Sequence, residues 1–270
     1  MNFPRVPLAA PMLAAALLSA ACWAQSSATT GNTTAAINAQ NANNVCRVYF
    51  FKPKPGADAQ YEAGRKKHMQ FHRTQKDTFT WGTWLIQTGE NTGTYVTSTC
   101  GHAWKDFDEW EKRMGKADTA DSNINLVPNA GATWDGFYVE RADLSLAPPN
   151  RPPAAMTAVT IYVLKPGAAP DFIGAVTKIN AALQKSSDIP KNSTWLQLIN
   201  GGEGPSFVLL SDRNSYADMA PGPKSIIDAV TDAYGQETSD QIFKTIRNST
   251  AHVSTELAEY RADLSYVPGK

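Results

Sequence analysis

A pentapeptide that occurs twice constrains the fold of this chain more than any other feature. Arg-Ala-Asp-Leu-Ser occupies residues 141–145 and again residues 261–265. Shorter matches occur in the same order, namely Lys-Pro-Gly at 54–56 and 165–167 and Thr-Trp-Leu at 83–85 and 194–196. A duplication keeps the order and nearly the spacing of such matches. The sequence therefore predicts two related units of roughly 100 residues each, a usual size for a small domain.

Composition marks the ends of these units. The first residues combine Arg5 with an apolar run and small side chains up to Ala24, which is typical of a signal peptide. The small and polar residues that follow bury too little surface to offset their ordering entropy. Four closely spaced prolines predict an extended linker. We expect a signal peptide, a disordered tether, a first unit, a linker and a second unit at residues 1–24, 25–44, 45–147, 148–157 and 158–267.

The signal peptide predicts a secreted or periplasmic protein. Its apolar run is too short to span a bilayer, so we expect no membrane span, although a lipid anchor at Cys22 is an alternative. Two cysteines remain: Cys46 opens the first expected strand and Cys100 ends the third, and these strands should be antiparallel neighbours. Because export leads to an oxidising compartment, Cys46 and Cys100 are expected to form a disulfide. The alternative is a pair of buried free thiols. The oligomeric state is left open.

The charge balance excludes one class of partner. The chain carries 25 Lys and Arg against 25 Asp and Glu, and its basic residues do not cluster. Nucleic-acid binding needs a concentrated positive surface. We therefore expect no nucleic-acid partner.

The first unit follows the order strand, helix, strand, strand, helix, strand. Branched and aromatic residues predict a strand at Val45–Phe51, and a helix follows at Asp58–Gln75. A hairpin is expected at 79–100, apolar residues recur at helical spacing over 104–114, and Phe137–Leu144 is expected to be the closing strand. This order is typical of the ferredoxin-like βαββαβ fold, whose helices cover one face of an antiparallel sheet.

Two such units would bury their uncovered sheet faces against each other. In element order and duplication, the chain resembles the dimeric α+β barrel superfamily, which includes antibiotic-biosynthesis monooxygenase-like, stress-responsive and NIPSNAP-like families. The resemblance extends over nearly all of the expected mature chain and involves no family-specific catalytic motif. It implies an α+β fold of two ferredoxin-like repeats packed as a pseudo-dimer within one chain, with ligand pockets between helices and sheet.

Two histidines, His68 and His72, are the candidate catalytic residues. They lie four residues apart on the expected helix 58–75, so both rings occupy one face, and apolar neighbours indicate that this face is turned toward the sheet. At an offset of 111 residues, the second unit carries Ile179 and Leu183 instead. Polar rings therefore replace aliphatic side chains in one unit only.

Three interpretations of this pair stay open. The histidines could be core residues satisfied by local hydrogen bonds. They could bind a ligand or act as an acid and base, because imidazole titrates near neutral pH. They could also supply two ligands of a metal ion, with His102 or a carboxylate as the third. Since the spacing assigns no third ligand, we predict neither a metal site nor a cofactor.

Five aromatic side chains are candidates for lining a ligand pocket near these histidines. Aromatic residues in strands are more often part of a core, and only otherwise form a flat wall for a ligand. A cavity with such walls would suit a small apolar or aromatic molecule. The candidates are Tyr49, Tyr61, Trp84, Tyr95 and Trp104.

The sequence is compatible with three functions. The first is an exported small-molecule-binding protein with an apolar pocket between helix and sheet of the first unit. The second, which the resemblance implies, is a cofactor-independent oxygenase-like enzyme that uses His68 and His72. The third is a structural or interaction protein without pocket chemistry. Whether the protein is an enzyme is left open, because function depends on the site and not on the fold.

Overall fold

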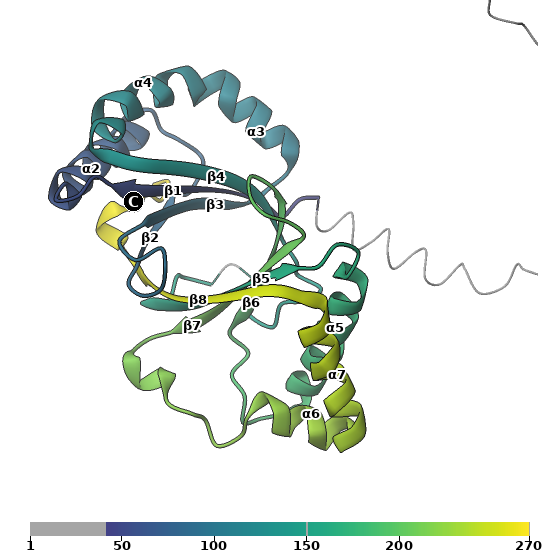
Figure 1. Ribbon diagram of the computed structural model, residues 1–270. Helices are drawn as coiled ribbons and strands as arrows, with labels where there is room; N and C mark the ends of the chain where they lie inside the picture. The colour runs from purple at the N-terminus through teal and green to yellow at the C-terminus, as the bar shows by residue number, and fades with distance from the viewer. Residues whose placement is uncertain (1–41, 150, 270) are drawn as a thin grey trace, which may run out of the picture. The chain divides into compact units, whose positions relative to one another are not determined.

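Eight antiparallel strands close into one barrel in the computed structural model, which describes residues 42–149 and 151–269 (Figure 1). The order of strands around the barrel is β1-β3-β2-β8-β5-β7-β6-β4. The strands are β1 (Val45–Pro53), β2 (Gly82–Ile86), β3 (Tyr95–His102), β4 (Ala130–Glu140), β5 (Met156–Leu164), β6 (Ser193–Asn200), β7 (Ser206–Arg213) and β8 (Thr250–Tyr260).

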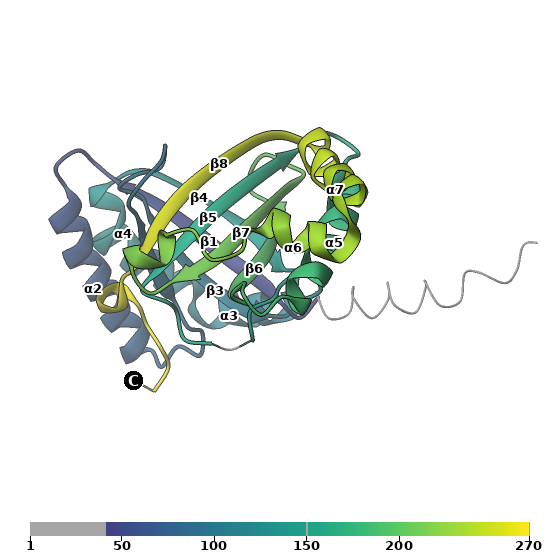
Figure 2. The same ribbon diagram turned by 90° about the horizontal axis from the view of Figure 1, so that it is seen from below.

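Helices pack on the outside of the barrel in two groups, as Figures 1 and 2 show. One group, α2 to α4, covers the strands of the first half (residues 45–147), and the other, α5 to α7, covers those of the second half (158–267). The helices are α2 (Asp58–Thr74), α3 (Trp104–Trp110), α4 (Lys116–Asn125), α5 (Ala169–Lys185), α6 (Ile226–Tyr234) and α7 (Gln236–Ser249). Short helical turns are η1 (Glu111–Gly115), η2 (Val127–Asn129), η3 (Tyr216–Met219) and η4 (Ala262–Leu264).

The expectation of two ferredoxin-like repeats packed face to face is wrong. Strand β2 of the first half is hydrogen-bonded to β8 of the second, and β4 is hydrogen-bonded to β6. These two junctions join all eight strands into a single closed sheet, so neither half has a sheet of its own. Closure removes the unpaired strand edges that two separate sheets would expose. Local sequence patterns predict strands and not the pairing of their edges, which is why the error arose.

Each copy of the repeated pentapeptide forms a tight turn directly after a strand. The expected closing strand Phe137–Leu144 is too long at its end, because β4 stops at Glu140. Arg141 then donates two hydrogen bonds to Asp143, at 2.8 and 2.7 Å, and the second copy repeats this pairing. An extended strand would hold side chains two positions apart well separated along its length. The Arg–Asp pair therefore belongs to a turn.

Each turn packs beneath a helix of the opposite half. Asn180 of α5 donates a hydrogen bond to the carbonyl of Leu144, and Arg65 of α2 donates one at 3.2 Å to the carbonyl of Leu264. Both leucine side chains are buried. The turn that ends each half therefore packs against the other half, so the two ends are exchanged. This exchange places residues 261–266 beside helix α2, where they help to form the site described below.

The expected disulfide between Cys46 and Cys100 is confirmed. Cys46 lies at the start of β1 and Cys100 near the end of β3, and these strands are antiparallel neighbours. Their Cα atoms are 4.0 Å apart. The bridge joins the two strands at one end of the barrel.

We expect the double substitution Cys46→Ser and Cys100→Ser to lower the free energy of unfolding by about 4 kcal/mol in the chain-entropy model. The reason is that the bridge links residues 54 positions apart and so restricts the unfolded chain. Urea denaturation of the oxidised wild type and the variant measures the difference. Reduced wild type is the matched control and should lose a similar amount. Equal stability of the oxidised wild type and the variant would contradict the prediction.

The expected signal peptide and most of the expected tether lie outside the described residues. Within residues 42–149 and 151–269, each helix is too short or too polar to cross a lipid bilayer.

Candidate metal centre

Helix α2 supplies both histidines from its buried face. Asp58 in its first turn and Arg73 in its last turn complement the helix dipole. Gly64 lies one turn before His68, and a Cβ there would be 1.8 Å from the carbonyl oxygen of Asn125 in α4. A glycine is therefore required at this position for the close approach of the two helices. That approach brings the acidic residues of α4 next to the histidines.

A π-helical turn, η1, orients α4 toward the same site. It follows α3 directly and precedes α4. A π turn rotates less per residue than an α-helix, so it changes which side chains beyond it face inward. Trp110 before the turn and Asp118 and Asp121 after it all point to the histidine side.

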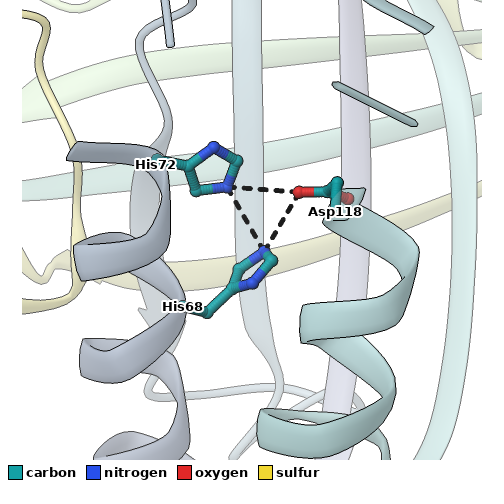
Figure 3. Close-up of side chains that lie close together, drawn as sticks. All are labelled: His68, His72 and Asp118. Atoms are coloured by element: carbon teal, nitrogen blue, oxygen red, sulfur yellow. Dashed lines mark hydrogen bonds and ion pairs between the residues drawn. The ribbon is translucent and has the colours of Figure 1, made fainter. Parts of the chain in front are cut away.

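Three atoms converge between α2 and α4: Nε2 of His68, Nε2 of His72 and Oδ1 of Asp118 (Figure 3). The two nitrogens are 3.3 Å apart, and Asp118 Oδ1 lies 3.5 Å from His68 and 3.4 Å from His72. Both imidazoles are almost fully buried, with exposures of 4% and 2%. Two imidazoles and one carboxylate are the ligand set of several catalytic metal sites.

The other ring nitrogen of each histidine, Nδ1, contacts a further carboxylate. His68 Nδ1 lies 2.7 Å from Asp121 Oδ1, and His72 Nδ1 lies 2.9 Å from Asp77 Oδ2. Since a carboxylate accepts a hydrogen bond, the network assigns the ring proton to Nδ1 in both histidines. The Nε2 lone pairs then point at each other and at Asp118. Metal-binding histidines in proteins show the same arrangement, in which a carboxylate fixes the tautomer and the ring orientation.

Burial shifts the pKa values of this cluster. Burial, and then the positive charge of Arg65, lower the pKa of His68 to about 3, so its ring is neutral near pH 7. Burial raises the pKa of Asp118 to about 6. With both rings neutral and protonated at Nδ1, all three converging atoms accept, and a cation or a proton between them would satisfy them.

The spacing of these atoms suits a four-coordinate ion. An ion roughly 2.1 Å from all three atoms would make ligand–metal–ligand angles of about 108°, close to the tetrahedral geometry of zinc sites. In an octahedral site with the same metal–ligand distance, neighbouring ligand atoms would be only about 3.0 Å apart, which is closer than the three atoms are here. Only three protein ligands are present in the cluster, so a fourth position is left for water or a substrate.

Asp77 organises the aromatic wall behind His72. Its carboxylate, 2% exposed as a residue, accepts hydrogen bonds from the indole N–H groups of Trp81 at 2.8 Å and Trp110 at 3.0 Å. Arg113 also contacts it at 3.2 Å. Burial alone would raise the pKa of Asp77, but the hydrogen bonds from His72, Trp81 and the Phe79 backbone outweigh it and lower the pKa to about 2. Asp77 is therefore ionised at neutral pH.

A cavity of about 190 Å³ adjoins the three ligand atoms. It lies between the helices and the strands of the first half, where the alternation of β1 turns Tyr49 and Phe51 toward α2. Tyr266, from the exchanged end of the second half, stacks on His72 with ring centroids 5.7 Å apart. The lining comprises Tyr49, Phe51, Arg65, His68, His72, Trp81, Thr97, Trp110, Asp118, Thr119, Ser122, Asn123 and Leu126.

The five aromatic residues predicted from the sequence lie in different places. Tyr49 lines the cavity beside the histidines. Tyr61 and Tyr95 pack together in a buried cluster with ring centroids 4.8 Å apart. Trp104 is 43% exposed. Trp84 points into the barrel.

The barrel interior holds a larger cavity of about 320 Å³, lined by residues from all eight strands and by the segment 151–154. Its lining is mainly apolar and, among the described residues, contains no histidine and only the disulfide-bonded Cys100 as a cysteine. The smaller cavity under α2 combines converging polar atoms with aromatic walls. We therefore regard the smaller cavity as the candidate site.

The acidic residues that complete the cluster were not predicted from the sequence. Of the two options considered for a third ligand, the structure places a carboxylate, Asp118, beside both histidines. His102 instead stacks on Phe79 at 3.8 Å and lies 2.6 Å from the hydroxyl of Thr99. The available signal was the spacing of Asp118 and Asp121, which are three residues apart and so share one helix face.

Solved structures with a similar fold include an anthrone oxidase-like protein and a candidate monooxygenase. The anthrone oxidase-like protein has a TM-score of 0.52 at 11% identity, with 84% of this chain and 94% of that chain covered. The candidate monooxygenase, from Lactobacillus acidophilus NCFM, has a TM-score of 0.51 at 8% identity, with 84% and 97% covered. At these identities, the likeness shows the fold alone. No protein-family model matches the sequence, and no curated protein matches it either.

These comparisons correct the resemblance drawn from the sequence. The similarity extends over nearly the whole of each solved chain, so it concerns the complete closed barrel and not one ferredoxin-like half. The resemblance to the dimeric α+β barrel superfamily as a tandem of ferredoxin-like repeats is therefore wrong. The chain shares the barrel fold of the anthrone oxidase-like protein and the candidate monooxygenase.

Proposed function

We propose that this protein binds a divalent transition-metal ion through His68, His72 and Asp118, and a small molecule in the cavity beside that ion. The convergence of three ligand atoms with spacings of 3.3 to 3.5 Å supports this proposal most directly. The fourth coordination position would face the bound molecule and would allow the ion to polarise it or to activate a water.

The geometry favours metal ligation over the two other interpretations of the histidines. A carboxylate on Nδ1 would also suit an acid or base that acts through Nε2. Here both Nε2 atoms converge with Asp118 Oδ1 on one point, which favours ligation of an ion. A purely structural pair would find hydrogen-bond donors for its Nε2 atoms. Instead, the Nε2 atoms lie 3.3 Å from each other and 3.4 to 3.5 Å from Asp118 Oδ1, which is longer than usual hydrogen bonds.

An iron(II)-dependent oxygenase is a second candidate function. Two histidines and one carboxylate also hold iron in non-haem oxygenases. The names of both solved neighbours refer to oxidation chemistry, which supports testing this reaction class. The metal found in protein purified from its native host would separate the two candidates, because zinc has no redox chemistry.

We also propose that the protein acts in an oxidising compartment, either secreted or periplasmic. The Cys46–Cys100 disulfide supports this location, because disulfides persist mainly outside the cytosol. The signal peptide expected at residues 1–24 would direct the export.

Titration of metal-free protein with Co²⁺ tests the proposed function. We expect one Co²⁺ per chain, with the intense visible absorption of a four-coordinate ion, and displacement of Co²⁺ by Zn²⁺. Bound metal should also raise the melting temperature, because it binds only the folded state. The absence of saturable binding at one ion per chain would overturn the proposal.

A further inference from the structure

We infer that the small molecule is a planar organic anion, an aromatic carboxylate or phenolate, whose charged oxygen lies between the metal ion and the guanidinium of Arg65. This inference rests on the proposed metal centre and specifies the class of molecule that would bind there. It follows from three features of the cavity: an unpaired buried cation, the local charge balance and the aromatic walls.

Arg65 is a buried cation that lines the cavity without an acidic partner. Its residue exposure is 3%. Its hydrogen bonds go to neutral groups, from Nε to the carbonyl of Leu264 at 3.2 Å and from Nη2 to the hydroxyl of Thr83 at 3.1 Å. Within the described residues, no carboxylate lies within 4.0 Å of its guanidinium nitrogens, and Nη1 donates no hydrogen bond. A buried guanidinium is normally paired, so its free side is suited to an anionic ligand.

The local charge balance also favours an anion once a metal is bound. The guanidinium groups of Arg65 and Arg113 and a divalent ion together carry four positive charges. The carboxylates of Asp77, Asp118 and Asp121 carry three negative charges. Because both histidines are needed as neutral ligands, one positive charge is left over. A monoanion would neutralise it.

The cavity has the size and walls for one aromatic ring. Its volume of about 190 Å³ exceeds the roughly 150 Å³ of an apolar cavity known to hold benzene. Tyr49, Trp81 and Trp110 are among its lining residues, together with the charged Arg65 and Asp118. A molecule with an aromatic ring and one charged oxygen suits this combination of side chains.

Benzoate and its neutral isostere benzamide, added to Co²⁺-loaded protein, test the inference. We expect benzoate to change the Co²⁺ absorption spectrum and to bind at least about tenfold more tightly than benzamide, as expected for a charge-assisted pair. The substitution Arg65→Met should reduce this preference to the part that the metal ion provides, while one Co²⁺ per chain still binds. The exposed neighbour Lys66 provides the matched control, and Lys66→Met should keep the preference.

Arg65→Lys provides a second variant should Arg65→Met fail to fold, because it keeps the charge and loses the planar fork. We expect it to weaken benzoate binding with little effect on benzamide. Equal affinity for benzoate and benzamide in the wild type, or a benzoate preference that both Arg65 variants keep in full, would overturn the inference and leave the metal centre intact. Failure of the wild type to bind Co²⁺ would overturn both.

Discussion

Substitution of His68 and His72 by alanine is expected to abolish Co²⁺ binding, while the barrel stays folded. Each imidazole supplies one of three converging ligand atoms, and their removal leaves Asp118 alone. Loss of an outer carboxylate alone typically weakens metal binding by about 10- to 100-fold, so loss of two ligands should exceed that range. Titration of metal-free protein with Co²⁺ measures the effect. His252→Ala is the matched control, because this histidine is exposed on β8.

The outer carboxylates allow a graded version of this test. Asp121→Asn keeps the shape of the side chain but replaces the carboxylate by a weaker, neutral acceptor. In the wild type, Asp121 Oδ1 lies 2.7 Å from His68 Nδ1. We expect about 10- to 100-fold weaker Co²⁺ binding for Asp121→Asn and a larger loss for Asp118→Ala. Wild-type affinity in the double histidine variant would show that the ion binds elsewhere.

Substitution of Asp77 by alanine is expected to destabilise the fold by about 3 to 5 kcal/mol, because three buried donors lose their acceptor. The change leaves the indole N–H groups of Trp81 and Trp110 without their acceptor and removes the partner of His72. Each unsatisfied buried donor costs about 1 to 3 kcal/mol. Urea denaturation of metal-free protein measures the loss without a contribution from bound metal.

The exposed Asp263 provides the control for that measurement. Its side chain is 45% exposed and pairs with Arg261 at 3.0 Å. Asp263→Ala should therefore cost less than about 1 kcal/mol, as for other surface ion pairs. If Asp77→Ala proved no more destabilising than Asp263→Ala, the central role assigned to the Asp77 network would be wrong.

Local sequence patterns determined several parts of this protein. The apolar face of helix 58–74 carries both His68 and His72 at a spacing of four, which is enough to bring the two rings together. The Cys46–Cys100 pair was likewise predictable, because the two cysteines belong to strands expected to be neighbours. The second half carries Ile179 and Leu183 at the positions equivalent to the two histidines, which indicated that the site lies in the first half. These features depend on residues close in sequence or on a simple strand order.

Tertiary structure decided the rest. Closure of the barrel depends on pairing between β2 and β8 and between β4 and β6, whose edges are far apart in sequence. The exchange of the pentapeptide turns brings Leu264 against Arg65, 199 positions away. Asp118 reaches the histidines only because the π turn and the close contact at Gly64 orient α4. Helical and strand periodicity are properties of short segments, whereas strand closure and the convergence of ligands come from packing between distant segments.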